Sequence, residues 1–348
     1  MTGAPVGGPP EPIPLTVLTG FLGAGKTTFL NRALAASDLA GTLVVVNEFG
    51  TAPLDQHLLT VAEGDLLLLS SGCLCCTIRG SLSRLLEDLL RRKDNRRIAG
   101  FSRVVIETTG LADPAPVLAS VLSHPYLSRR YRLSGVVTVV DGLNAGPTLE
   151  RHAEARRQVL LADTLLLSKL DAGGANETAG DLRARLSALN PSARIIDTQD
   201  AATDPLDILF GAPFAPQRRS PEGRRLLWRE SLRVPSGEED GSHDADRHSD
   251  DVRAFSVPIG HPLGRDVLAA LLGALADVFG ARILRLKGLV APADRPMEPL
   301  AVHMVQGTIA PAQPLERWPH ETGQGFLQII GEQLDEPAVR AIIASSLR

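Results

Sequence analysis

The sequence has few cysteines, little net charge and no long hydrophobic run. Its three cysteines are an odd number packed within four positions, so they do not form a disulfide framework. A formal net charge of -4 over 348 residues gives no bulk attraction to nucleic acid or to an anionic membrane. No apolar run reaches the length needed to span a bilayer. We therefore expect neither nucleic acid nor a membrane as a partner.

The first residues also lack the features of an export signal. Residues 1–13 are rich in glycine and proline and contain no basic segment followed by an apolar one. We expect them to be a disordered lead-in and the protein to be cytoplasmic. In a reducing cytoplasm, clustered thiols are typical of metal ligands or redox groups.

Apolar β-branched runs alternate with amphipathic stretches over the first two-thirds of the chain. Several of the runs are continuously apolar, as expected for parallel strands that are covered on both faces. The alternation predicts a doubly wound, mostly parallel α/β domain over residues 14–210. The predicted strands are Leu15–Thr19, Thr42–Val46, Asp65–Leu69, Arg103–Glu107, Gly135–Val140, Thr164–Leu167 and Arg194–Asp197. The predicted helices are Lys26–Ala36, Ser81–Lys93, Pro114–Ser123, Glu150–Leu160 and Gly180–Leu189.

The alternation ends near Phe210. Within residues 211–252, the stretch Ser236–Asp251 has almost no apolar residue and predicts a linker or exposed loop. Residues 253–348 predict a smaller α+β domain with a closing helix. Its predicted strands are Phe255–Ile259, Ala281–Val290, Leu300–Val305 and Gly325–Ile330, and its predicted helices are Gly264–Phe279 and Glu336–Leu347.

The strongest motif is GFLGAGKT, from Gly20 to Thr27, which matches the P-loop pattern G-x-x-x-x-G-K-[ST]. Its glycines let successive backbone N–H groups point at phosphate oxygens, and the following helix N-terminus adds partial positive charge. We expect Lys26 to reach the β- and γ-phosphates and the Thr27 hydroxyl to bind Mg²⁺. A chance glycine turn is the alternative, but the motif follows a predicted strand and opens a predicted helix.

A second motif, Ser168-Lys169-Leu170-Asp171, follows the predicted strand Thr164–Leu167. A carboxylate at Asp171 can accept hydrogen bonds from guanine N1 and the 2-amino group, whereas adenine offers no such pair of donors. The stem of Lys169 can lie along the base. A helix cap or plain loop would have a similar sequence, but the position after the P-loop favours a guanine site.

Glu107 ends a predicted strand and Gly110 follows three residues later. An acid there is placed to act on Mg²⁺ or on the attacking water. The Gly110 N–H can contact the γ-phosphate and move when that phosphate leaves. A strand-ending acid beside a turn glycine is the alternative, but Asp113-Pro114 starts a helix at once and fixes the loop.

The cysteines Cys73, Cys75 and Cys76 form a C-x-C-C cluster after the predicted strand Asp65–Leu69. In a loop they can offer soft ligands to zinc, copper(I) or another thiophilic ion. Burial as small hydrophobes and a redox pair are the alternatives. Glu48 follows another strand and could be a further metal ligand, a switch carboxylate or a surface acid.

The histidines are less informative. Those in the charged stretch, His243 and His248, could bind metal loosely, but a solvated tether explains them as well. His261, His303 and His320 show no ligand spacing, so we expect them to be structural.

Taken in order, GFLGAGKTTFLN, VVVNEFG, GCLCC, VVIETTGLADP and SKLD resemble the CobW-like family of metallochaperone GTPases, relatives of the nickel-insertion GTPases UreG and HypB. RLKGLV, AVHMVQG and LERWP resemble the CobW C-terminal domain, so the resemblance covers nearly the whole chain. It implies GTP-gated transfer of zinc or a similar metal to a client metalloprotein, with GTP, Mg²⁺ and Zn²⁺ as the bound groups.

The resemblance also implies roles for particular residues. Cys73, Cys75 and Cys76 would be the transfer ligands, with Glu48 assisting. Lys26, Glu107 and Gly110 would serve hydrolysis, and Ser168, Lys169 and Asp171 would bind the base. The residues implied to hold phosphate and Mg²⁺ are Gly20, Gly23, Ala24, Gly25, Lys26, Thr27 and Thr28.

Three alternatives remain open at this point. The first is a nucleotide-binding structural zinc protein or metal buffer without useful turnover. The second is a P-loop kinase or ATPase, against which Ser168–Asp171 argues. The third is delivery of cobalt or iron, for cobalamin synthesis or a nitrile hydratase. A homo-oligomer built through the second domain is also compatible with the sequence.

Overall fold

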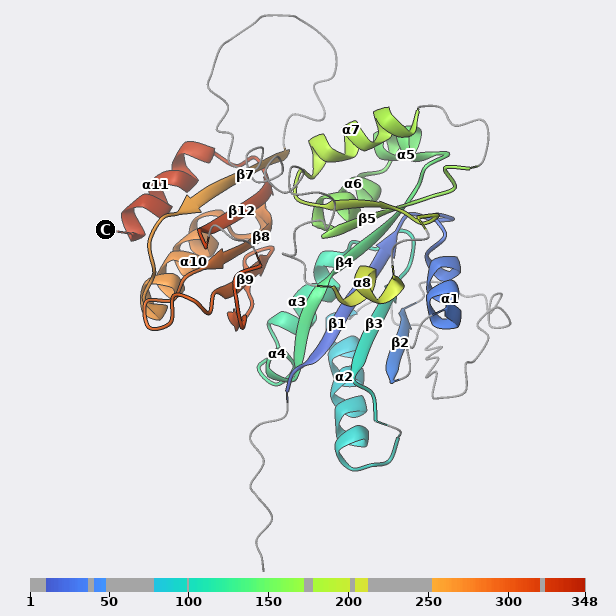
Figure 1. Ribbon diagram of the computed structural model, residues 1–348, viewed down its shortest axis with the longest axis horizontal. Coiled ribbons are helices and arrows are strands. Elements are labelled where there is room, and N and C mark those ends of the chain that lie inside the picture. The colour runs from blue at the N-terminus through green and yellow to red at the C-terminus, as the bar shows by residue number, and fades with distance from the viewer. Residues whose placement is uncertain are drawn as a thin grey trace, which may run out of the picture.

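A computed structural model gives the arrangement of two β-sheets and their helices (Figure 1). It describes residues 11–36, 41–47, 78–98, 100–171, 178–200, 204–211, 252–319 and 323–347. Glu48, the three cysteines, the predicted strand Asp65–Leu69 and the charged stretch Ser236–Asp251 lie outside these ranges. Within them, no helix is long and apolar enough to cross a membrane.

The first sheet is entirely parallel over the residues described, in the order β2-β3-β1-β4-β5-β6. The chain fills β1, β2 and β3 on one side and then crosses to β4, β5 and β6 on the other. The strand order thus reverses direction beside β1. Doubly wound sheets bind their ligands at such a point, outside the carboxyl ends of the strands. The strands are β1 (Ile13–Gly20), β2 (Thr42–Asn47), β3 (Arg103–Thr108), β4 (Tyr131–Asp141), β5 (Thr164–Ser168) and β6 (Arg194–Asp197).

Helices cover both faces of this sheet, which confirms the predicted α/β architecture and explains why its strands are continuously apolar. One face packs against α1 (Lys26–Ala36) and α8 (Pro205–Phe210). The other face packs against the remaining helices. These are α2 (Ile78–Asp94), α3 (Pro114–Leu122), α4 (Leu127–Arg130), α5 (Ala145–Arg151), α6 (Ala153–Leu161) and α7 (Ala179–Leu189).

One helix prediction was wrong. The sequence pattern predicted a single helix over Glu150–Leu160, whereas α5 and α6 are separate and break at His152. His152 has extended backbone angles, φ -121° and ψ 110°. Its ring lies 4.5 Å from the ring of Phe21, centroid to centroid. The break is a tertiary effect, because nothing in the local sequence stops a helix there.

The second sheet is antiparallel, in the order β10-β9-β8-β12-β7, with β11 paired to β9. Its outer face carries α10 (Arg265–Phe279) and α11 (Glu336–Ser346), as Figure 1 shows, so the smaller α+β fold is confirmed. The predicted strand Ala281–Val290 starts late because 280–282 form a 3₁₀ turn. The strands are β7 (Val252–Ile259), β8 (Ile283–Val290), β9 (Leu300–Val305), β10 (Thr308–Ile309), β11 (Gln313–Pro314) and β12 (Gly325–Glu332).

The inner face of the second sheet packs against the first unit. Leu284, Val305 and Ile330 join the apolar cluster that α2 and α3 form on the first sheet. Strand alternation also places polar side chains on this buried face. They are Arg285, Lys287, His303 and Gln328. The two units therefore share one continuous core and a buried polar contact.

Asp163 is the partner of the two cations on that face. It precedes β5 and accepts hydrogen bonds from the Arg285 guanidinium and, at 3.4 Å, from Lys287 Nζ. Arg285 also donates to the carbonyl of Leu161 at the end of α6. Burial alone would raise the pKa of Asp163, but the two cations and the Val136 N–H outweigh it and hold that pKa at about 2. A carboxylate therefore persists at the junction over the whole physiological range.

Candidate functional site: a phosphate-binding loop and its neighbours

The P-loop turns from the end of β1 into α1 at the carboxyl edge of the first sheet. Gly20 has φ +143°, and a Cβ built there would lie 2.3 Å from the carbonyl oxygen of Val139. Gly25 has φ +94°, which side chains rarely adopt. The loop thus requires glycine at Gly20, where a side chain would collide with the backbone of β4, and at Gly25, where the φ angle is one that side chains rarely adopt.

Lys26 lies against the first carbonyls of this loop. Its Nζ donates to the carbonyl oxygens of Gly20 at 2.8 Å and of Phe21 at 3.2 Å. Burial lowers the pKa of Lys26, while the nearby charge of Glu107 raises it. A partly desolvated ammonium held at a helix N-terminus is suited to binding a phosphate oxygen.

The hydroxyl of Thr27 and the carboxylate of Glu107 meet beside Lys26. Thr27 Oγ1 donates to Glu107 Oε1 at 2.7 Å, and Glu107 is buried at the end of β3. The neighbouring Thr108 and Thr19 hydroxyls hydrogen-bond at 2.7 Å, which ties β3 to β1 at this level. Mg²⁺ prefers hard oxygen ligands. The Thr27 hydroxyl and the Glu107 carboxylate, which are already hydrogen-bonded to each other, are oxygen ligands of the kind that fits such an ion.

Gly110 abuts the P-loop from the β3 side. A Cβ built on it would lie 2.6 Å from the backbone nitrogen and 2.7 Å from the Cα of Leu22. Only glycine lets these two backbones approach so closely. The carbonyls of Gly110 and Ala112 both accept hydrogen bonds from Gln158 on α6. Asp113 then caps α3 by accepting from the Ala115 N–H at 2.9 Å.

Ser168 and Lys169 bind the other side of the P-loop. Ser168 Oγ donates to the Ala24 carbonyl at 2.7 Å, and Lys169 Nζ donates to the Gly23 carbonyl at 2.7 Å. Lys169 has φ +58°, so the chain turns sharply at the end of β5. Asp171, two residues further, is exposed to solvent. The structure thus brings two of the three predicted base-binding residues onto the P-loop backbone.

Thr28, Gly23 and Ala24 complete the predicted phosphate-binding set. Gly23 lies in open space, with nothing within 4 Å of a built Cβ, and Ala24 is buried under the loop. Thr28 is exposed on α1.

Sequence reasoning missed Asp141, the last residue of β4. Its carboxylate accepts from Lys169 Nζ at 2.8 Å, from the Leu143 N–H and from the Asn144 amide. Burial raises the pKa of Asp141, but these hydrogen bonds outweigh it and lower that pKa overall. The signal was an acid at the carboxyl end of an apolar strand. Gln158 and Arg157 on α6 were also missed, because they belong to no motif.

The predicted metal ligands Cys73, Cys75, Cys76 and Glu48 lie outside the described residues. The described ends of that connection are Asn47, which ends β2, and Ile78, which begins α2. The far end of α2 meets the start of β4, because Arg130 holds Asp94 through two bonds of 2.8 and 2.9 Å. The helix therefore runs antiparallel to the strands, and both ends of the connection lie at the P-loop edge. Elsewhere in the described ranges, no group of three or more metal-binding side chains occurs.

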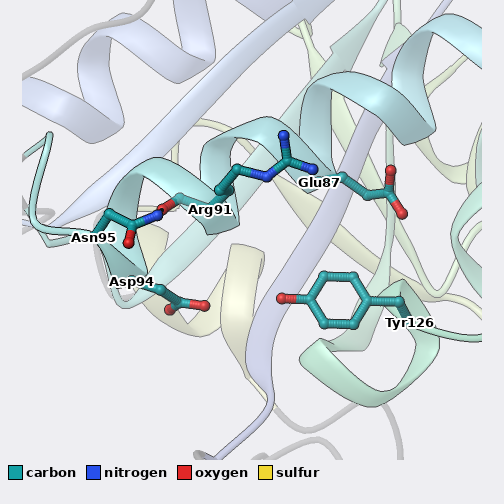
Figure 2. Close-up of a pocket in the computed structure, with 5 residues that line it drawn as sticks. All are labelled: Glu87, Arg91, Asp94, Asn95 and Tyr126. Carbon is teal, nitrogen blue, oxygen red and sulfur yellow. Dashed lines mark hydrogen bonds between the residues drawn. The ribbon is translucent and has the colours of Figure 1, made fainter.

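A groove of about 330 Å³ lies at the opposite end of α2 (Figure 2). Figure 2 shows side chains of α2 facing Tyr126 on the turn before α4. The lining residues are Glu87, Arg91, Asp94, Asn95 and Tyr126. The groove is remote from the P-loop and does not belong to the nucleotide site.

Together, the parallel sheet and the loop that Lys26 closes define a P-loop nucleotide-binding protein. Residues 14–197 match the family described as "CobW/HypB/UreG, nucleotide-binding domain". Residues 252–347 match "Cobalamin synthesis protein cobW C-terminal domain". The chain belongs to the CobW family.

Several relatives align with the chain over nearly their whole length. "Zinc chaperone YjiA" of Escherichia coli is 31% identical over 334 residues, which cover 96% of this chain and 98% of that protein. "Zinc chaperone CobW" of Pseudomonas aeruginosa is 29% identical over 96% of this chain and 92% of its own length. The crystal structure of the Zn(II)-bound YjiA GTPase from E. coli superimposes with a TM-score of 0.62 at 28% identity, covering 97% of this chain and 99% of that one.

Proposed function

We propose that this protein is a GTP-hydrolysing metallochaperone that binds zinc at its C-x-C-C cluster and transfers it to a client protein under GTP control. The observation that supports this most strongly is the meeting of Thr27 and Glu107 beside Lys26, in a chain whose full-length relatives are named zinc chaperones. The proposal keeps a GTPase domain over residues 14–210 and a second domain over 253–348, supported by family matches over 14–197 and 252–347 and by the two separate sheets.

In this proposal the nucleotide lies along the P-loop. Lys26 binds the β- and γ-phosphates, and Thr27 supplies the hydroxyl ligand of Mg²⁺, which when bound neutralises charge on the phosphates. The loop backbone contributes Gly20, Gly23, Ala24 and Gly25, with Thr28 at the start of the helix. Glu107 acts on Mg²⁺ or on the attacking water, and Gly110 contacts the γ-phosphate.

The guanine base lies against Lys169, with Asp171 accepting from its N1 and 2-amino groups. Ser168 acts indirectly, because its hydroxyl is used by the Ala24 carbonyl of the P-loop. Lys169 is held in the same way by Gly23 and Asp141. Hydrogen bonds from Ser168 and Lys169 to the P-loop backbone therefore connect the base site to the phosphate site. A substitution that shifts one of these sites should also shift the other.

Zinc is the cargo in this scheme. Cys73, Cys75 and Cys76 supply soft thiolate ligands and Glu48 assists, which leaves room for ligand exchange with a client. The connection that carries all four residues begins and ends at the P-loop edge, so its ends are near the γ-phosphate. Metal and GTP are then coupled by a free energy that is reciprocal between the two sites.

The proposal also covers the binding partner of the protein and its location in the cell. The partner is a client metalloprotein, and the second domain supplies a surface for recognising it or for forming a homo-oligomer. We place the protein in the cytoplasm, where the three thiols stay reduced.

The test is GTP hydrolysis by purified apo protein with and without one equivalent of zinc, alongside Cys75→Ala. Zinc should change the turnover of the wild type and leave the variant unaffected. Lys26→Ala serves as the control that abolishes turnover without touching the cysteines. Turnover that ignores both zinc and Cys75→Ala would remove the coupling and leave a GTPase with a structural or redox thiol cluster.

A further inference from the structure

We propose that Gln158 is a positioning residue for GTP hydrolysis, which sets the loop of Gly110 against the phosphate site. This inference rests on the proposed GTPase function. Among the described residues, the side chain of Gln158 hydrogen-bonds to the Gly110 and Ala112 carbonyls and to no P-loop atom, so it acts through the backbone of the loop that follows β3.

The side chain of Gln158 binds two backbone carbonyls of the loop that are two residues apart, those of Gly110 and Ala112. Gln158 is 1% exposed and lies on α6. Its Nε2 donates to the Gly110 carbonyl at 3.1 Å and to the Ala112 carbonyl at 3.0 Å, so both amide hydrogens are used. Its own main-chain carbonyl accepts from Thr138 Oγ1 at 2.8 Å, which holds α6 on β4.

The loop is confined from its other side by the P-loop. Because Gly110 already presses on the backbone of Leu22, it cannot move further toward the phosphate-binding turn. Gln158 prevents it from moving away. The peptide of Gly110 is therefore held between two rigid elements, which is the preorganisation that a γ-phosphate contact requires.

Only the donor function of Gln158 is used. Within the described part of the chain, its Oε1 is buried and has no hydrogen-bond partner. A buried acceptor without a partner costs free energy, so the residue is placed for what its NH₂ group does. A protonated carboxylic acid in its place could make one of the two bonds, whereas a carboxylate could make neither.

Helix α6 holds the end of the same loop through a second contact. Arg157 Nη1 pairs at 3.1 Å with Asp113, which caps α3, and its Nη2 reaches Glu332 of the second sheet at 3.6 Å. Adjacent residues of α6 thus hold both Gly110 and Asp113. Gln158 is the buried member of this pair and the one that contacts the glycine directly.

The experiment compares wild type, Gln158→Met and Gln158→Glu. Gln158→Met keeps the shape and removes the donor, and we expect kcat to fall about 10- to 100-fold while GDP affinity stays within about threefold. Burial raises the pKa of a carboxyl group at this position. Gln158→Glu should therefore match Gln158→Met at high pH and recover turnover as pH falls, relative to the wild-type profile.

Gln313→Met, half-buried on the edge strand β11, is the matched control and should keep wild-type kinetics. A Gln158→Met protein with wild-type kcat overturns the proposal. So does a folded variant that loses GDP affinity and kcat equally, since that is a structural role. If Gln158→Met does not fold, the test rests on Gln158→Glu. A dependence of its kcat on pH that parallels that of the wild type would then overturn the proposal.

Failure of the proposed function is distinguishable from failure of this inference. If the wild-type protein hydrolyses no GTP, the proposed GTPase function is contradicted, whatever the role of Gln158. The role of Gln158 is then measured as the ratio of affinities for a non-hydrolysable GTP analogue and GDP. Gln158→Met should lower that ratio, and an unchanged ratio overturns the role.

Discussion

Asp163 and Arg285 meet across the junction between the two sheets, each almost fully buried. Asp163 precedes β5 of the first sheet and Arg285 lies on β8 of the second. Arg285 also bonds the Leu161 carbonyl at the end of α6, two residues before Asp163. The second domain is therefore attached at the base of the helix whose Gln158 holds the Gly110 loop. A structural change at the junction could therefore reach the Gly110 loop through α6 alone.

Removing the buried carboxylate should destabilise the protein strongly. Asp163→Ala leaves Arg285 and Lys287 buried without their counter-charge, at a cost of about 3–5 kcal/mol in the free energy of unfolding. Chemical denaturation followed by circular dichroism measures it. The exposed pair Arg265–Asp294 supplies the control, because Asp294→Ala should cost under about 1 kcal/mol. Equal effects of the two substitutions would contradict the structure.

The junction should also make the protein sensitive to acid. Burial, together with the charge of Arg285, lowers the pKa of His303 from an ordinary value of 6.5 to about 4, although the carboxylate of Asp163 opposes the shift. Between those values the unfolded chain binds a proton that the folded protein excludes. Stability should therefore fall as pH drops from 6.5 toward 4, by at most about 1.4 kcal/mol per pH unit for one group.

A second acid window belongs to Asp163. Its pKa of about 2 lies below its ordinary value of 3.8, so its stabilisation is complete above pH 3.8 and is lost as pH falls toward 2. Unfolding free energies measured from pH 7.5 to 2 test both windows. His303→Gln should flatten the dependence between pH 6.5 and 4 and leave the lower window intact. An unchanged profile would mean that another group titrates there.

The contact between Thr27 and Glu107 predicts a shared loss of magnesium-dependent turnover. Thr27→Ala and Glu107→Gln should each lower kcat on the order of 10²- to 10³-fold, the range seen when one charge-stabilising group is removed. The double variant should lose little more than either single one, since the two residues act as a unit. Turnover against Mg²⁺ concentration is the measurement, with Thr308→Ala on β10 as the control. Additive losses would argue for separate roles.

The close approach of Gly110 to Leu22 predicts a specific effect of one methyl group. Gly110→Ala should force the loop away from the P-loop, because the new Cβ meets backbone atoms that cannot give way. GTP hydrolysis should fall while GDP binding is retained. Gly260→Ala is the control, since nothing lies within 4 Å of its Cβ. The measurements are kcat and the affinities for GTP and GDP. A fully active Gly110→Ala protein would show that the loop does not act on the γ-phosphate.

Asp171 predicts base specificity. In the proposed base site its carboxylate would accept from guanine N1 and the 2-amino group, whereas an amide in its place would donate to the 2-oxo group of xanthine. Asp171→Asn should lower GTP affinity by about 10² or more and raise that for xanthosine triphosphate. Competition against a fluorescent nucleotide measures both. Lowered affinity for both nucleotides would place Asp171 in loop structure instead.

Much of this molecule could be predicted from local patterns. Continuous apolar runs predicted strands buried on both faces, and the G-x-x-x-x-G-K-T loop predicted a backbone that only glycine permits, as Gly20 and Gly25 bear out. Both signals are local, because they depend on burial periodicity and on allowed φ values. The predicted guanine motif and the acid Glu107 were identified in the sequence by their position at strand ends, where a parallel sheet brings loops together.

What the sequence by itself determined is the P-loop, the strand and helix pattern of both units and the family. Only the tertiary structure decided the break at His152, the use of Ser168 and Lys169 on the P-loop backbone and the clamp of Gln158 on Gly110. It also decided that Arg285, Lys287 and His303 are buried, because the second sheet turns its polar face onto Asp163. Each of these depends on residues tens of positions apart or more, and no local pattern encodes which surface will cover them.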